Sequence, residues 1–405
     1  MLSFMRGNAR WLAAGVLLTF SSSYGQTFFI SVFATQIRAE FGLSDGAWGL
    51  IYTAGTAASA VVMIWAGALT DRFRVRDLTM AILPLLACAC ALMMFVSAIW
   101  ALPVVIFALR LMGQGMTSQI ATVAMARWYD KNRGKALSIA TLGFSIGEAV
   151  LPLVFVMLML VFDWQTLWGL AGLMALAAAP AIWVLLREER TPLAAADQQS
   201  STGMGARHWS RNEVFRHWLF WTMVPTIMGI SAFVTAFFFQ QTHLAQIKGW
   251  QHLELVALFP LYTLTAVLTM LGSGLAIDRF GTAPMMALFQ VPLALCFLVL
   301  AASDTLTGAA IGLVLMGVTT GGNATLPSAF WAEFFGTRHV GAIKAMAAAV
   351  MVLGSAIGPG LSGVLIDAGV DFSQQMYGLA FYFLVASVTI GLGVRRAAPA
   401  LARTT

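Results

Sequence analysis

Two ionisable side chains, Arg110 and Glu148, lie near the middle of long apolar segments of this 405-residue chain. An unneeded charge at that depth in a bilayer costs at least about 2.5 kcal/mol, so such residues are expected to serve a purpose. The planar guanidinium of Arg110 suits a carboxylate or another anion, and Glu148 suits the uptake and release of a proton. Three alternatives stay open: a structural ion pair for Arg110, a neutral acid bonded to a neighbouring helix for Glu148, and a pairing of the two.

Polar side chains at helical spacing extend this candidate site. Arg110, Gln114 and Thr117 occupy positions i, i+4 and i+7, which places them on one face of an α-helix. Similar polar faces occur in the first, seventh and tenth apolar segments, and aromatic side chains there suit either a cavity wall or simple packing. The residues predicted to bind a substrate are Arg110, Gln114, Thr117, Gln26, Tyr24, Asn323, Thr319 and Tyr262, and the wall candidates also include Phe29, Phe33, Tyr52, Phe237 and Phe330.

The histidines and cysteines of the chain do not have the spacing that a catalytic site or a metal centre requires. The five histidines lie in loops or near the ends of apolar segments, and no Gly-rich loop ending in Gly-Lys-Ser or Gly-Lys-Thr is present for ATP. The three cysteines lie inside apolar segments and suit packing. The sequence therefore predicts no catalytic residue, no metal and no cofactor. Any transport would draw its energy from an ion or solute gradient.

The composition indicates which elements hold these residues. Hydrophobic residues make up 60% of the chain and charged residues only 10%, whereas a soluble domain has roughly 25% charged residues. The net charge is +6, yet the basic residues are dispersed between apolar runs, which argues against a nucleic-acid partner. The expected partner of this surface is a lipid bilayer.

Runs of about 20 apolar residues, the length that spans a bilayer, occur twelve times. A polar, arginine-rich stretch at residues 187–216 separates the first six from the last six and indicates a flexible cytoplasmic linker. We therefore expect an all-α membrane protein with twelve transmembrane helices in two pseudo-symmetric six-helix bundles, residues 1–186 and 217–405. The predicted spans are residues 11–34, 48–70, 78–99, 102–126, 136–161, 164–186, 217–239, 255–277, 284–302, 306–330, 343–366 and 376–394.

The basic residues also predict an orientation. With a cytoplasmic N-terminus, twenty of the 23 Lys and Arg residues fall in cytoplasmic segments. Only Arg38 and Lys248 fall in outer loops, and Arg110 falls within a span. This bias follows the positive-inside rule. It predicts a multi-pass protein of the cell (inner or plasma) membrane with both termini in the cytoplasm.

A repeated motif supports the division into two halves. The pattern Gly-x-x-x-Asp-Arg-Phe ends the second span at Gly67, Asp71 and Arg72, and it ends the eighth span at Gly274, Asp278 and Arg279. Two copies at equivalent places indicate an internal repeat. The glycine would allow close helix approach, and the charges would bond helix ends across a closing gate. These six residues are the predicted gating residues, and the alternative is helix capping and topology alone.

At this point the chain resembles the major facilitator superfamily over nearly its whole length. The loop after the second span is similar to the family signature Gly-x-x-x-Asp-Arg-x-Gly-Arg-Arg, with Arg74 in place of the second glycine. Span four carries Arg-Leu-Met-Gly-Gln-Gly from Arg110, which is similar to the family's membrane-embedded arginine motif. The antiporter form of the family motif has Gly-Pro in span five, where this chain has Gly147 and Glu148, so the resemblance argues against a drug/proton antiporter.

Residues 127–140 are similar to the monocarboxylate-transporter and oxalate/formate-exchanger branch of this family. The Asp-Arg pair that mammalian members of the branch carry in span eight is absent between residues 255 and 277. The expected function is a secondary active transporter that moves a small organic anion with protons by alternating access. A proton-driven efflux transporter of amphipathic, drug-like compounds is the first alternative, and a non-transporting membrane sensor or receptor is the second.

Overall fold

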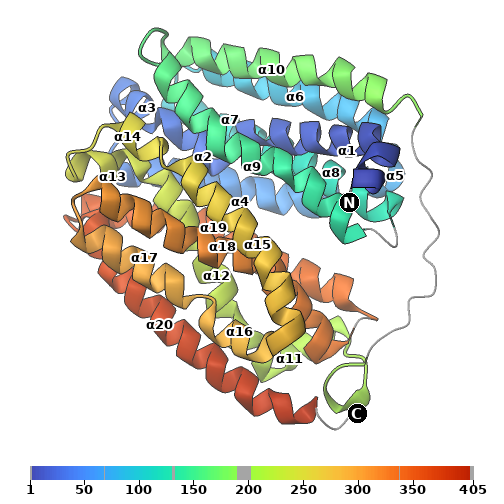
Figure 1. Cartoon of the computed structure of the whole chain (residues 1–405). Helices are drawn as coiled ribbons and strands as arrows, with labels where there is room; N and C mark the ends of the chain where they lie inside the picture. The colour runs from blue at the N-terminus through green and yellow to red at the C-terminus, as the bar shows by residue number, and fades with distance from the viewer. Residues whose placement is uncertain (1, 68, 130–132, 189–201, 337, 402–405) are drawn as a thin grey trace. The chain divides into compact units, whose positions relative to one another are not determined.

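The structure, a computed structural model, describes residues 2–67, 69–129, 133–188, 202–336 and 338–401. Asp71 and Asp278 are described by their backbone alone. Within these ranges every regular element is an α-, 3₁₀- or π-helix (Figure 1). Eleven helical segments are long and apolar enough to cross a membrane, and a pair bent by 48°, Phe4–Gly25 with Thr27–Phe41, brings the number to twelve. The predicted all-α membrane fold is confirmed.

The chain forms two compact units, Met1–Asp197 and Gln198–Thr405. In the first unit, the first span packs on the fifth, the second on the fourth and the third on the sixth; the last pair, α6 and α10, lies side by side in Figure 1. The helices of this unit are α1 (Leu2–Ser21), η1 (Ser22–Gly25), α2 (Thr27–Ile30), η2 (Ser31–Phe33), α3 (Ala34–Phe41), α4 (Asp45–Ala66), α5 (Leu69–Arg72), α6 (Val75–Met94), η3 (Ile99–Ala101), α7 (Leu102–Leu109), η4 (Arg110–Thr117), α8 (Ser118–Trp128), α9 (Arg133–Leu158) and α10 (Trp164–Leu185).

The second unit repeats the same pairing: α12 packs on α19, α15 on α18, and α17 on α20. The six-plus-six repeat that the sequence predicts is therefore present in the packing. The helices of this unit are η5 (Met204–Ala206), α11 (Arg211–Arg216), α12 (Trp218–Phe239), α13 (Gln241–Ile247), α14 (His252–Val256), α15 (Phe259–Phe280), α16 (Thr282–Leu288), α17 (Val291–Ala302), α18 (Leu306–Phe335), α19 (Val340–Asp367), α20 (Phe372–Ala397) and η6 (Ala398–Ala400).

Glycines on the fifth span of each unit bring the paired helices into backbone contact. A Cβ atom added to Gly143 of α9 would lie 2.0 Å from the Val16 carbonyl oxygen of α1. A Cβ atom added to Gly358 of α19 would lie 2.0 Å from the Ala232 carbonyl oxygen of α12. Close backbone approach at small residues is how membrane helices gain packing energy without a hydrophobic driving force. The two units therefore share one packing device at equivalent positions.

The polar stretch between the units differs from the flexible linker that the sequence predicts. Residues 189–201 lie outside the described residues, but 202–216 are folded against the end of α18. The Trp209 N–H donates to the Phe335 carbonyl oxygen over 3.1 Å, and a capping box between Ser210 and Glu213 starts α11. Hydrogen bonds from Ser210 hold the pKa of Glu213 below its usual range. Local capping and an aromatic anchor outweigh the loop-like composition here.

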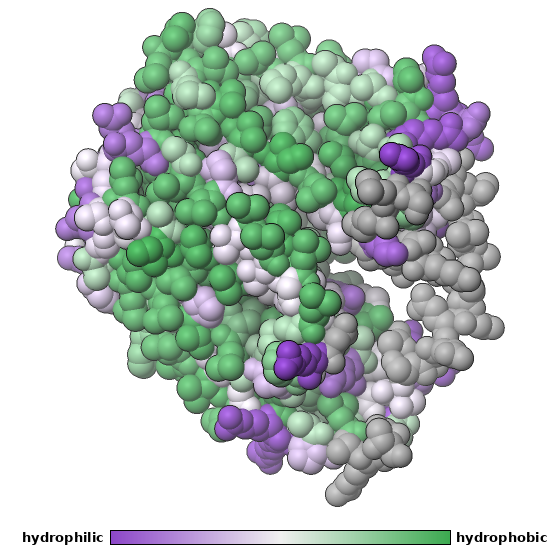
Figure 2. Space-filling view, viewed as in Figure 1, coloured by the Kyte–Doolittle hydropathy of each residue, from purple (hydrophilic) through white to green (hydrophobic). Residues whose placement is uncertain are grey.

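Large apolar side chains cover the outside of the long helices. Ile64, Trp65 and Leu275 are among those that expose more than half of their surface. Figure 2 shows apolar residues over the visible faces of α10 and α15, with hydrophilic residues gathered near helix ends. An exposed apolar surface of this extent is suited to lipid and not to water.

Candidate functional site

The first span is broken in the middle of the first unit. α1 ends at Ser21, and Gln26 adopts an extended conformation (φ −87°, ψ 153°) between η1 and α2. The sequence Ser-Ser-Ser-Tyr-Gly-Gln-Thr at residues 21–27 interrupts an otherwise apolar run. A break inside a membrane helix frees backbone groups that must be satisfied by neighbours or by a ligand.

The fourth span departs from α-helical geometry at the same level. Residues Arg110–Thr117 form the π-helix η4 between α7 and α8, and η4 packs on η1. The hydroxyl of Thr117 donates to the Met112 carbonyl oxygen five residues earlier, over 2.6 Å. π-Helical turns are rare and occur frequently at functional sites. The break in span one and the π-helix in span four therefore form one irregular region.

Arg110 is the charged centre of this region and exposes only 3% of its surface. Its Nη1 atom donates to the Gly25 carbonyl oxygen over 3.2 Å and to the Thr27 hydroxyl over 3.3 Å. The Thr27 hydroxyl is in turn hydrogen-bonded to the Tyr52 hydroxyl at 2.5 Å. The Tyr52 ring lies 5.5 Å from the guanidinium carbon of Arg110. The backbone break and two hydroxyl side chains thus fix one end of the guanidinium.

The other edge of the Arg110 guanidinium is unpaired among the described residues. Its Nε atom is buried without a hydrogen-bond partner, and neither Nε nor Nη2 bonds to any described residue. Nor does a carboxylate of the described residues lie within 4.0 Å of the guanidinium. Nε and Nη2 form the fork that binds both oxygens of a carboxylate. The site therefore presents a bidentate anion-binding edge in a buried position.

Glu148 does not pair with Arg110, which corrects one of the alternatives left open by the sequence. Glu148 exposes 8% of its surface and forms no hydrogen bond or ion pair with the described residues. Phe144, one turn earlier on α9, packs its ring on Phe28 at 5.6 Å, and a Cβ atom on Gly147 would lie 2.1 Å from the Ser23 hydroxyl oxygen. α9 thus contacts the broken part of span one, the same segment that Arg110 holds through Gly25 and Thr27.

The remaining predicted residues of the first unit separate into two groups. Gln26 lies in the break, and Gln114 lies on η4 with partial exposure. Thr117 is fully buried, and because a π-helix has more than 3.6 residues per turn, the predicted common face of Arg110, Gln114 and Thr117 is wrong. Tyr24 packs on Phe29 at 5.4 Å. Phe29 and Phe33 pack on Trp168 at 5.3 and 5.1 Å, so these rings form the core of the unit and not a cavity wall.

In the second unit, two of the three predicted residues are engaged in packing. The Thr319 hydroxyl donates to the Phe289 carbonyl oxygen over 2.9 Å, and Tyr262 packs on Phe238 at 5.4 Å. Asn323 keeps partial exposure and forms no hydrogen bond with the described residues. Of the three, Asn323 is therefore the residue whose side chain is available to a ligand.

The first copy of the repeated motif forms a compact turn. The Gly67 N–H donates to the Met63 carbonyl oxygen over 2.9 Å and caps α4, and Arg72 is exposed at the end of α5. Arg127, from the end of α8, donates to the Thr70 carbonyl oxygen over 2.6 Å. Arg74 adopts an extended conformation (φ −66°, ψ 146°), so the turn needs no glycine where the family signature has one.

The second copy differs in its contacts. A Cβ atom on Gly274 would meet nothing within 4 Å, so the close helix approach expected from this glycine is absent. Arg279 is exposed, and here the turn uses Gly281 at φ +76°. The Thr282 hydroxyl donates to the Glu333 carboxylate of α18. In the second unit the turn is therefore held by an acidic side chain of the fourth span, Glu333. In the first unit the equivalent turn is held by a basic side chain, Arg127.

Sequence reasoning missed Gly25, Gly113 and Thr27, and it named Tyr52 only as a wall residue. A Cβ atom on Gly25 would lie 2.1 Å from the Leu109 carbonyl oxygen, which makes glycine necessary there. The run of small and polar residues at 21–27 was the signal that could have located the break.

Helices of this kind, with a broken span and a buried, partly unpaired arginine, are typical of a polytopic membrane transporter. The family match and the similar structures that follow point to a transporter and not to an enzyme. The chain belongs to the Major Facilitator Superfamily, whose family model matches residues 15–274 and 226–404.

Solved structures of the same fold include two membrane transporters. A bacterial homolog of the human lysosomal transporter Spinster, in an inward-facing and unoccupied conformation, is 17% identical with a TM-score of 0.70, and the match covers 97% of this chain and 98% of that one. The nucleoside transporter NupG is 13% identical with a TM-score of 0.70, and the match covers 96% of this chain and 98% of that one. The search of curated proteins gave no match.

Proposed function

We propose that this protein is a secondary active transporter that moves a small organic anion, of the monocarboxylate type, together with protons by alternating access. The observation that carries the proposal is the unpaired Nε–Nη2 edge of Arg110, buried beside the broken span one. A buried cation without a counter-charge is strongly disfavoured, and a bound carboxylate supplies the missing charge. Removal of the anion would leave the arginine to be satisfied by water or by a rearrangement of the site.

Glu148 supplies the proton in this proposal. An ionised carboxylate without partners costs several kcal/mol in an apolar interior, so a buried Glu148 is favoured in its neutral, protonated form. When the site opens to water, the proton can leave. Protonation and release during the transport cycle then couple the anion to the proton gradient. Because Glu148 and Arg110 form no ion pair in this structure, the coupling does not require direct competition for one arginine.

An aromatic cavity wall would suit efflux of amphipathic compounds, but the aromatic residues of span one give that alternative little support. Tyr24, Phe29 and Phe33 are occupied by contacts within the first unit. A carboxylate-binding edge has no role in the export of a neutral amphipathic compound.

The test is uptake by the purified protein in liposomes across a panel of radiolabelled monocarboxylates, each paired with its neutral amide. We expect acids and not amides to accumulate, and an inward proton gradient to accelerate the uptake. Arg110→Lys should weaken binding strongly because lysine lacks the planar fork, and Arg110→Ala should abolish transport. Equal uptake of acid and amide, or full transport by Arg110→Ala, would exclude an anion-binding role for Arg110. If none of the acids is taken up while drug-like cations are exported, the efflux alternative is correct.

A further inference from the structure

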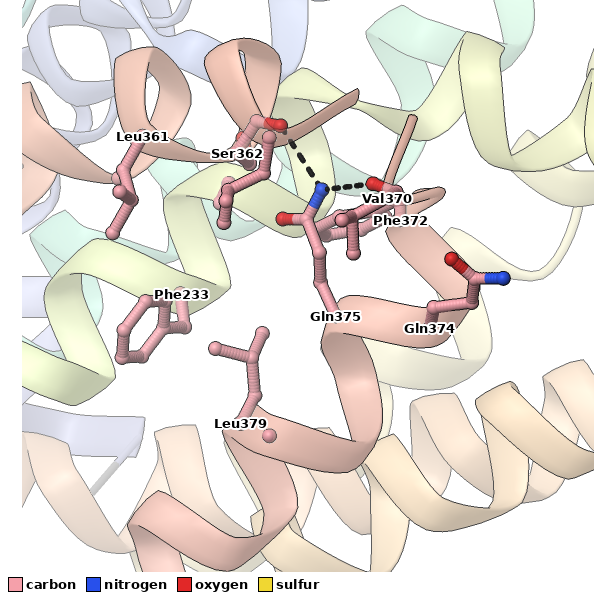
Figure 3. A pocket seen from close by; sticks show the side chains of 12 residues that line it. Phe233, Leu361, Ser362, Val370, Phe372, Gln374, Gln375 and Leu379 are labelled. Carbon is pink, nitrogen blue, oxygen red and sulfur yellow. Dashed lines mark hydrogen bonds between the residues drawn. The ribbon is translucent and has the colours of Figure 1, made fainter. Parts of the chain in front are cut away.

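A cavity of about 350 Å³ lies within the second unit, and none of the predicted substrate-binding residues lines it. It is formed between α12, α19 and α20. Figure 3 shows Phe233 of α12, Leu361 of α19 and Leu379 of α20 around the open space. Leu365 and Phe372 complete the apolar part of the lining. The cavity is therefore suited to an apolar ligand.

Exposed side chains of α19, of α20 and of the connection between them border the cavity. Leu361 and Val370, which line it, expose 47% and 38% of their surface, and Gly378 at its edge is exposed. The neighbouring Val364 and Phe381 on the same two helices expose 44% and 69%. Both α19 and α20 pass the length and hydropathy criteria for membrane spans. In a bilayer, hydrocarbon chains would lie directly against these exposed side chains.

One end of the cavity is polar and lies at the connection between α19 and α20. The Gln375 amide donates to the carbonyl oxygens of Ser362 and Val370 over 3.0 and 2.9 Å (Figure 3). Gln374 is exposed, and its side-chain oxygen accepts from the Asp371 N–H over 3.2 Å. These residues surround the short connection between the end of α19 and the start of α20. An amphipathic molecule with its polar part at this connection would direct its chain towards Phe233 and Leu361.

We propose that this cavity holds one acyl chain of a membrane phospholipid, with the headgroup at the connection between α19 and α20. An apolar cavity of roughly 150 Å³ accommodates a benzene molecule, so the observed volume suits a segment of a single chain and not a whole lipid. Headgroup contacts would be polar, through the exposed amide of Gln374. The site is separate from Arg110 and does not rest on the proposed substrate.

The position of the cavity gives the bound chain a structural consequence. Gly358, which lines the cavity, is also the residue in backbone contact with Ala232 of α12. Ser362 accepts a hydrogen bond from Gln240 of span seven over 3.2 Å. A chain in the cavity therefore fills the space between α20 and the α12–α19 pair. Without it, the lining residues lose dispersion contacts on one side.

The test uses the full-length protein in phosphatidylethanolamine–phosphatidylglycerol vesicles that contain a trace of phospholipid with a diazirine near the end of one acyl chain. After irradiation, the labelled peptides are mapped by mass spectrometry. We expect labelling at Phe233 and within residues 358–379 severalfold above that of Leu264 and Leu268 of α15, which expose 57% and 59% of their surface. Gly378→Trp should fill the cavity and remove the excess label. The matched control is Gly272→Trp on α15, where a Cβ atom also meets open space; it should leave the excess unchanged.

Leu379→Trp provides a second blocking variant should Gly378→Trp fail to insert. If α19 and α20 are labelled no more than α15, the label comes from lipid that surrounds the whole protein, and the proposal is wrong. The same conclusion follows if a folded blocking variant keeps the excess label.

Discussion

The backbones of Gly25 and Gly113 are in direct contact. A Cβ atom built on Gly113 would lie 2.6 Å from the Cα atom of Gly25, and one built on Gly25 would lie 2.8 Å from the Cα atom of Gly113. Gly25 belongs to the break in span one, and Gly113 belongs to the π-helix of span four. The contact brings the Gly25 carbonyl oxygen to Arg110. Two local irregularities, each unfavourable alone, are thus stabilised together.

Because of this contact, even a methyl group added at Gly113 should destabilise the protein. Gly113→Ala should lower the free energy of unfolding by about 1–3 kcal/mol, because the backbones must separate to admit the methyl group. Gly272→Ala is the control, since a Cβ atom there meets nothing; it should be neutral or stabilising through better helix propensity. Thermal unfolding in detergent compares the two. Equal melting temperatures would mean that the contact is looser than described.

The hydroxyl pair beside Arg110 predicts graded losses of affinity. Thr27→Val removes the side-chain acceptor that orients the arginine, and a hydrogen bond to a charged group is worth roughly 1.5–3 kcal/mol, so substrate affinity should fall by about tenfold or more. Tyr52→Phe leaves Thr27 in place and removes its neutral hydrogen bond to that residue, so a loss of about twofold to fivefold is expected. Binding is measured by substrate protection against thermal unfolding. If Tyr52→Phe is the weaker binder of the two, Thr27 does not position the arginine.

The two irregular segments also show where sequence reasoning ends. Span positions follow from composition, and the predicted segment 164–186 coincides with α10, Trp164–Leu185. The break at Gln26 and the π-helix at Arg110 depend on a contact between residues 88 positions apart in the chain. A periodicity argument assumes 3.6 residues per turn and cannot detect such a contact. Arg110 itself was predictable, because charge at membrane depth is visible in the sequence, but its bonding partners were not.

The topology is a separate prediction, and two polar contacts within the first unit agree with an even number of spans there. Arg10 forms an ion pair with Glu188 at 2.6 Å, which puts the N-terminus and the end of span six on one side. Glu40 accepts from the indole N–H of Trp164 over 2.8 Å, which joins the opposite ends. Reporter fusions after Arg187 and Arg396 should report a cytoplasmic location, whereas fusions near Arg38 and Lys248 should report an external one. An external C-terminus would contradict the twelve-span arrangement.

The repeated motif predicts an effect on transport rate. Asp71, whose side chain lies outside the described residues, follows Thr70, whose carbonyl oxygen accepts from Arg127. In the gating proposal Asp71 helps to hold the closed state, so Asp71→Asn should lower turnover more than equilibrium substrate affinity. The control is Asp77→Asn in the first turn of α6. It also removes an acidic side chain close to the motif, and it should leave turnover unchanged. A normal rate in well-inserted Asp71→Asn protein would reduce the residue to a helix cap or topology marker.

Glu148 carries the most specific prediction, because it is an acid buried in a span with no described bonding partner. Glu148→Gln imitates the permanently protonated form, so the substrate should still bind at Arg110 and exchange across the membrane. The variant can no longer release or take up a proton, and an inward proton gradient should not accelerate its uptake. Counterflow and gradient-driven uptake are measured on the same vesicles, with the wild-type protein as the reference for both rates. Retained counterflow with lost gradient response assigns the proton to Glu148, whereas intact gradient-driven accumulation would leave this carboxyl group a packing residue of α9.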